Sequence, residues 1–124
     1  MIEPFTAASD DTRVATIAHL NDRTRQGLDR TARIMMTSSC LATFAPGDRA
    51  AGIVAQAQLL AALRRHEFSE AEARERDRGS FTFRGTTVYF RIDYYDADLA
   101  YGSENPADAN VTRRVLTIML REDL

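Results

Sequence analysis

The first apolar pattern along the chain has the period of an α-helix. Between residues 9 and 26, Ile17 and Leu20 recur at helical spacing among other apolar positions, while charged residues occupy the remaining faces. Ser9 suits the start of this helix because its hydroxyl can accept a free backbone N–H, and Gly27 suits its end. We therefore expect a first helix over residues 9–26.

A second stretch with the same period follows Pro46-Gly47. Asp48 is placed to cap it, and the helix is expected to run to about Arg65. Its apolar positions form a wide stripe, which we expect to be buried: Ile53, Val54, Ala57, Leu60, Ala61 and Leu63.

Four other segments show the residue types or the alternation of β-strands. A β-branched and sulfur-rich segment covers residues 33–39. Two segments around Gly85, residues 80–84 and 86–94, have the signature of a hairpin. The last strand is expected over residues 112–121.

The two faces of the later strands differ. In residues 86–94 an apolar face alternates with a polar one that carries Tyr89, Arg91, Asp93 and Tyr95. In residues 112–121 both faces are largely apolar, which favours a central strand or a second covered face. A second copy of the chain would supply such a cover, so a homodimer is one expected partner.

The element order α-β-α-β-β-β places the helices early and the strands late. This order is typical of an α+β domain, with two helices packed on one face of an antiparallel sheet of about four strands. We expect a disordered leader over residues 1–8 and a single domain over residues 9–124.

Composition narrows the class of protein. The 124 residues contain one cysteine, no apolar run of membrane-spanning length and no basic, apolar start, so we expect a cytoplasmic protein without a membrane partner. All 16 basic residues are arginines, yet the formal net charge is −2. Non-specific binding to duplex DNA is therefore disfavoured.

The C-terminal third resembles an uncharacterised bacterial family, domain of unknown function 3768. The residues that carry the resemblance are Ile92-Asp-Tyr-Tyr-Asp, Asp98-Leu, Tyr101-Gly-Ser, Pro106-Ala-Asp and the stretch Thr112 to Leu120. Leu20-Asn-Asp and Gly79-Ser-Phe-Thr-Phe are weaker parts of the same pattern, so the resemblance covers roughly residues 15–124.

The resemblance implies a short accessory protein of plasmids, prophages or integrated elements, which often act by binding a host protein. Family members often carry Glu-His followed by Asp-Phe-Gly just before the hairpin. Here the matching stretch reads Glu75-Arg-Asp-Arg-Gly. The histidine and the phenylalanine are absent, so a site built on that histidine is not expected in this chain.

An acidic and aromatic segment follows the hairpin and supplies the candidate contact residues for a partner. They are Tyr89, Arg91, Asp93, Tyr95, Asp96, Asp98, Tyr101 and Glu104. Tyrosine and arginine are common at binding hot spots, and carboxylates would engage an arginine-rich partner. The same aspartates would serve as turn caps, or as ligands of a hard cation in a metal-dependent enzyme.

Four arginines around the start of the hairpin form an alternative, nucleic-acid-binding strip: Arg74, Arg76, Arg78 and Arg84. Neighbouring glutamates and aspartates neutralise much of its charge, whereas phosphate contacts need an uncompensated patch.

Residue types suited to catalysis are few. His19 is placed to meet Asp22 on one helical turn, His66 falls at a helix end, and Cys40 follows a strand of small residues. None has a visible activating neighbour, so we expect no catalytic residues, no metal and no cofactor. The residues favour a non-enzymatic protein-binding module, and the family resemblance implies an inhibitor of a bacterial defence system of the anti-CRISPR or anti-restriction type. The alternative is a nucleic-acid-associated regulator.

Overall fold

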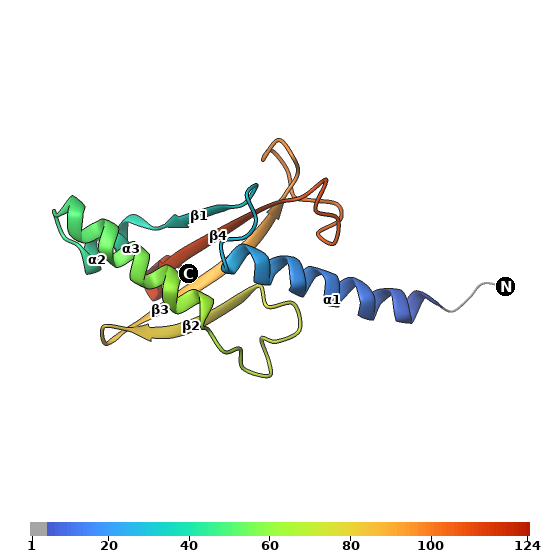
Figure 1. Cartoon of the computed structure of the whole chain (residues 1–124), viewed down its shortest axis with the longest axis horizontal. Coiled ribbons are helices and arrows are strands. Elements are labelled where there is room, and N and C mark those ends of the chain that lie inside the picture. The colour runs from blue at the N-terminus through green and yellow to red at the C-terminus, as the bar shows by residue number, and fades with distance from the viewer. Residues whose placement is uncertain (1–4) are drawn as a thin grey trace.

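A four-stranded sheet with α-helices on one face forms the body of the molecule (Figure 1). The computed structural model describes the backbone of residues 5–124 and the side chains of residues 10–124. The elements are α1 (Phe5–Arg25), β1 (Arg33–Met36), α2 (Ser38–Phe44), α3 (Arg49–Arg64), β2 (Arg78–Phe83), β3 (Thr86–Tyr95), β4 (Arg113–Leu120) and the 3-10 turn η1 (Arg121–Asp123).

The sheet has the strand order β1-β4-β3-β2 and is mixed. β3 pairs antiparallel with both β2 and β4, whereas β1 runs parallel to β4, with Arg33 opposite Val115. The expected α+β class is confirmed, with three α-helices and one parallel pair. Parallel strands need a long crossover connection, and α2, α3 and the hairpin supply it between β1 and β4.

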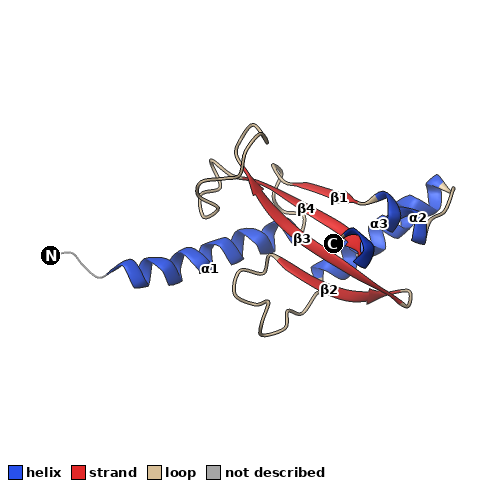
Figure 2. Ribbon diagram, turned by 180° about the vertical axis from the view of Figure 1, so that it is seen from behind, coloured by secondary structure: helices blue, strands red, loops and turns tan. Residues whose placement is uncertain are grey.

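The core lies between the sheet and the helices, as Figures 1 and 2 show from opposite sides. The expected inner face of β3 is buried: Val88, Phe90 and Ile92 are at most 2% exposed. They pack with Leu116 and Ile118 of β4 and with apolar side chains of α2 and α3. This alternation leaves every second residue of each strand on the other face of the sheet.

Helix α1 begins at Phe5, before its predicted cap at Ser9, and its N-terminal half projects beyond the sheet (Figure 1). Residues 1–4 of the predicted leader, which covers residues 1–8, lie outside the residues whose backbone the structure describes. The C-terminal half of α1 is anchored through buried residues that include Ile17 and Asn21.

The strand predicted over residues 33–39 ends at Met36, and a helix that the sequence did not predict, α2, follows directly. The Thr37 hydroxyl accepts the backbone N–H of Cys40 at 3.3 Å and so caps α2. Capping competes with continued strand pairing at this position, and it prevails here.

Helix α3 has the predicted cap, since the Asp48 carboxylate accepts the Ala51 N–H at 3.2 Å. The predicted buried stripe is wrong in part: Ile53 is 65% exposed and Val54 is 51% exposed. The buried row is instead Gly52, Ala55, Leu59 and Leu63. This row is the one that faces the sheet and α2, where a methyl group on Gly52 would lie 3.5 Å from a Leu41 methyl.

Among residues 5–124, no helix is both long enough and apolar enough to cross a membrane.

Candidate binding surface

The outer side of the sheet carries one alternating set of side chains, and the three α-helices lie on the opposite side (Figure 2). Pairing aligns these residues across all four strands: Met35 is opposite Thr117, Thr117 opposite Arg91, and Arg91 opposite Arg78. We call this surface the open face; it comprises Arg33 and Met35, Arg113, Val115, Thr117 and Met119, Tyr89, Arg91, Asp93 and Tyr95, and Arg78, Ser80 and Thr82.

The middle of the open face is apolar. Met35 is 51% exposed, and Val115 and Thr117 are half-buried beside it. Tyr89 and Tyr95 are also half-buried, so each presents part of its ring. β4 lies between β1 and β3, so the central strand predicted from its two apolar faces is confirmed, and Met119 on its outer face is only 2% exposed.

Positive charge predominates on the open face. The Arg91 guanidinium bonds the Asp93 carboxylate at 3.1 Å, and both groups are exposed. Arg78 pairs with Asp77 at 3.2 Å, and the hydrogen bond to Asp77 raises the pKa of Arg78. Within residues 10–124, Arg33 and Arg113 have no carboxylate within 4 Å.

The acidic loop, residues 96–112, continues from the end of β3 at one end of the sheet (Figure 2). Its turn is closed by the Asp96 N–H, which donates to the Tyr101 carbonyl at 2.8 Å, and by the Asp96 carboxylate, which accepts the Ala100 N–H at 3.0 Å. Asp98 and Glu104 are exposed on this loop, and Tyr101 is 77% exposed.

The turn interpretation of the aspartates is supported for Asp96 and also for Asp108, whose carboxylate accepts the Asn110 N–H at 2.9 Å. In the part of the chain with described side chains, no three histidine, cysteine or carboxylate groups are grouped as metal ligands.

A buried polar cluster, which the sequence did not predict, fixes the acidic loop to the sheet. Asn21 of α1 is 0% exposed; its amide N–H groups donate to the Tyr94 hydroxyl at 2.8 Å and to the Glu75 carbonyl at 3.0 Å. Its amide oxygen accepts Nε of Arg114 at 2.7 Å. Arg114 also donates to the Pro106 carbonyl at 2.6 Å, which ties the loop to β4.

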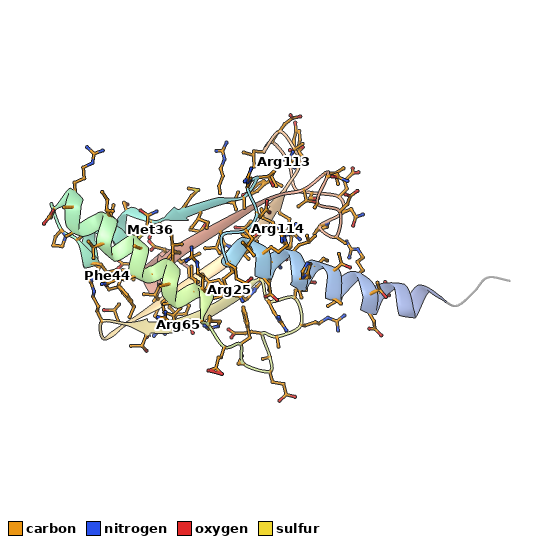
Figure 3. The ribbon with its side chains drawn as sticks, viewed as in Figure 1. Arg25, Met36, Phe44, Arg65, Arg113 and Arg114 are labelled. Atoms are coloured by element: carbon orange, nitrogen blue, oxygen red, sulfur yellow. The ribbon has the colours of Figure 1, made fainter. Side chains whose placement is uncertain are left out.

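Burial dominates the electrostatics of this cluster. It lowers the pKa of Arg114 and raises the pKa of Tyr94 to about 12. The Arg114 guanidinium lies 5.0 Å from the centre of the Tyr94 ring, a cation–π contact. Figure 3 shows Arg114 and its neighbour Arg113 at the start of β4; strand alternation directs the first to the helix side and the second to the open face.

The four arginines of the alternative strip do not share one surface. Arg76 bonds the Asp22 carboxylate under α1, and Arg84 bonds Gln58 of α3 at 2.6 Å beside the hairpin turn. Arg78 lies on the open face, and Arg74 is exposed in the loop before β2. Arg74 borders one surface hollow with Arg76 and another with Arg78, so these three lie near one another, whereas Arg84 is at the other end of β2.

The candidate catalytic groups also lie apart. The Asp22 carboxylate accepts hydrogen bonds from Arg25 and Arg76, and none is formed with His19. Cys40 is fully buried, and burial, with a smaller effect of Asp123, raises the pKa of its thiol.

His66 packs among aromatic rings, with its ring centre 4.6 Å from that of Phe68 and 5.2 Å from that of Phe90. Within the described side chains its Nε2 atom has no hydrogen-bond partner, and burial is the main cause that lowers its pKa. His66 therefore belongs to the core beside the hairpin.

The comparisons with known proteins identify a family and no function. Residues 44–123, which include the sheet strands β2, β3 and β4 and the acidic loop, match the family model described as "Protein of unknown function (DUF3768)". No curated protein and no solved structure matches the chain. The matched region covers well over half of the sequence, and the chain therefore belongs to the DUF3768 family.

Proposed function

We propose that this protein is a small protein-binding module whose contact surface is the open face together with the acidic loop. The observation that carries the proposal is a four-stranded sheet with α-helices on one side and, on the other, exposed arginines, the exposed Met35 and two half-buried tyrosines. Tyr89, Arg91, Asp93 and Tyr95, which the sequence singled out, all belong to this surface.

The residue types favour a protein as the partner. Tyrosine, methionine and arginine are enriched at the centres of protein interfaces, and an apolar middle with a polar rim is the usual arrangement. On the open face Val115 of the inner strand β4 lies between Arg33 of β1 and Asp93 of β3, and Met35 lies beside Arg33 on the edge strand β1.

The size of the surface indicates that the acidic loop takes part. β3 has ten residues and is about 33 Å long at ~3.3 Å per residue; four strands spaced ~4.8 Å apart span roughly 15 Å. Because β1 and β2 are short, the flat area is roughly 400 Å², below the ~800 Å² that each partner buries in a standard interface. Tyr101 and its neighbours supply the additional area.

A narrower proposal is that the partner belongs to a bacterial defence complex of the CRISPR or restriction type, with the protein acting as its inhibitor. Its support is the family resemblance to accessory proteins of mobile elements, which is an argument from association.

The test is co-purification of a tagged protein from cells that carry restriction and CRISPR systems. We expect a protein to be captured in stoichiometric amount by the wild type and lost from the Tyr89→Thr/Tyr95→Thr variant. Truncating one tyrosine hot spot costs about 2 kcal/mol, or roughly 30-fold in affinity. Ile53→Ser is the matched control, because Ile53 is exposed on α3, away from the open face.

A loop variant completes the test. Asp98→Arg with Glu104→Arg leaves the Asp96 turn intact and reverses the charge of two exposed positions. We expect it to lose the captured protein while its thermal unfolding stays unchanged. Capture that survives both the tyrosine and the loop variants contradicts the proposed contact surface.

A further inference from the structure

We propose that the open face binds an acidic segment of a partner protein, with carboxylates of the partner placed against its guanidinium groups. The inference rests on the proposed function and adds the chemistry of the partner. The open face carries four arginines and one aspartate, although the whole chain has a formal net charge of −2. Positive charge is thus concentrated on the side of the sheet opposite the helices.

Two of these arginines are available for a new ion pair. Arg33 and Arg113 have no carboxylate within 4 Å among the described side chains. The Arg91–Asp93 pair is exposed at both partners, and exposed pairs contribute little stability, so a carboxylate of the partner can replace Asp93 at small cost. Guanidinium groups bind carboxylates through two parallel hydrogen bonds, which favours this anion.

The apolar side chains next to the arginines specify the segment further. Val115 is directly opposite Arg33, and Met35 follows Arg33 on the same face of β1 and is opposite Thr117. A segment that presents apolar or aromatic side chains among its carboxylates would bury the exposed half of Met35 while its charges meet the arginines at the rim. A purely acidic chain would leave these apolar side chains exposed to water.

A second copy of the chain is the less favourable occupant. Two open faces placed against each other would bring two sets of arginines together, with Arg91 already directly opposite Arg78 within one sheet. Like charges brought together across an interface cost several kcal/mol. A homodimer would therefore need a different surface.

A single-stranded nucleic acid also fits less well. Tyr89 and Tyr95 are six residues apart, about 20 Å along β3, whereas neighbouring stacked bases lie about 3.4 Å apart.

The experiment measures fluorescence anisotropy with two labelled probes at low salt. One is a fluorescein-labelled random copolymer of glutamate and tyrosine, and the other is a fluorescein-labelled thymidine oligonucleotide. The test variant is Arg33→Thr with Arg113→Thr. Its matched control is Arg49→Gln with Arg64→Gln on α3, which changes the net charge by the same amount at exposed positions away from the open face.

We expect the wild type to bind the copolymer, the test variant to bind it about 3- to 30-fold more weakly, and the control to bind like the wild type. Three results would overturn the inference: no binding of the copolymer, equal weakening by the test and control variants, or tighter binding of the oligonucleotide that is lost in the test variant. The last result would assign the open face to nucleic acid.

The result separates the inference from the proposed function. If the Tyr89→Thr/Tyr95→Thr variant loses its captured protein while Arg33→Thr/Arg113→Thr retains it, the open face is a protein-binding surface and the acidic partner is wrong. If both variants retain the captured protein, that protein does not bind the open face, and the contact surface given in the proposed function is wrong.

Discussion

Substituting Asn21 by alanine should destabilise the whole domain, because one side chain joins four parts of the fold. Its amide bonds the Tyr94 hydroxyl on β3, the Glu75 carbonyl before β2 and Nε of Arg114 on β4, and Asn21 itself belongs to α1. Alanine would remove all three bonds at a site that is 0% exposed, while Arg114 keeps its bond to the Pro106 carbonyl and Tyr94 keeps its bond to the Glu75 carboxylate.

The magnitude follows from these bonds. The bond to the charged Arg114 guanidinium contributes about 1.5–3 kcal/mol and each neutral bond about 0.5–1.5 kcal/mol. Because the three share one side chain and do not add fully, we expect Asn21→Ala to lower the free energy of unfolding by about 3–4 kcal/mol. A domain of this size has about 5–15 kcal/mol in total, so the midpoint of thermal unfolding should fall by roughly 10–15 °C.

Urea unfolding followed by circular dichroism measures this effect. Asn110→Ala is the matched control, because Asn110 is exposed and only its backbone N–H takes part in the recorded bond to Asp108. We expect the control to change the free energy of unfolding by less than about 0.5 kcal/mol. A loss below about 1 kcal/mol for Asn21→Ala, or equal losses for both variants, would show that the cluster does not hold the fold together.

Three further predictions concern the hairpin and the C-terminus. Gly79→Ala places a methyl group 2.7 Å from Nε2 of His66 and 2.8 Å from the Phe90 ring. The free energy of unfolding, measured in urea, should therefore fall by about 1–3 kcal/mol. An unchanged free energy of unfolding would contradict this tight packing. Because the pKa of His66 is lower in the folded protein than in the unfolded chain, stability should be fully present above about pH 6.5 and fall as the pH drops below it. His66→Phe should flatten that part of the profile, and a profile identical to the wild type would exclude His66 as its cause. Asp123 accepts hydrogen bonds from Ser39, the Leu120 N–H and Thr37, which lower its pKa. Asp123→Asn should therefore reduce the protection of the Leu120 amide against exchange relative to its intrinsic rate, and the wild type should lose the same protection as the pH falls through the pKa of Asp123. Unchanged exchange in Asp123→Asn would mean that this carboxylate does not hold the C-terminal turn.

The features predicted correctly from the sequence are local ones. Asp48 caps α3, and Val88, Phe90 and Ile92 form the buried face of the hairpin strand. Each depends on neighbours close in the chain or on the alternation of a single strand, so the pattern contains the necessary information. The α+β class could be predicted because these local patterns give the order of helices and strands along the chain.

The features that the sequence missed depend on contacts between distant residues. Arg33 lies beside Val115, and Asn21 bonds Arg114, although many residues separate each pair. Neither pairing leaves a periodic signal. The exposure of Ile53 has the same origin: the helical period indicates an apolar side of α3, but the contacts with α2 and the sheet decide which row is buried.

The candidate surface itself illustrates this difference. The alternation of β3 placed Tyr89 and Arg91 on one face, and the structure confirms that shared face. Part of the positive charge of the surface comes from outside β3. The parallel pairing of β1 with β4 adds Arg33, together with the apolar Met35, to the open face. From the sequence, the carboxylates after β3 predicted an acidic contact surface in this region. Pairing across the sheet makes the open face basic and places the carboxylates in the loop at its end, so the partner expected at the sheet changes from an arginine-rich surface to an acidic one.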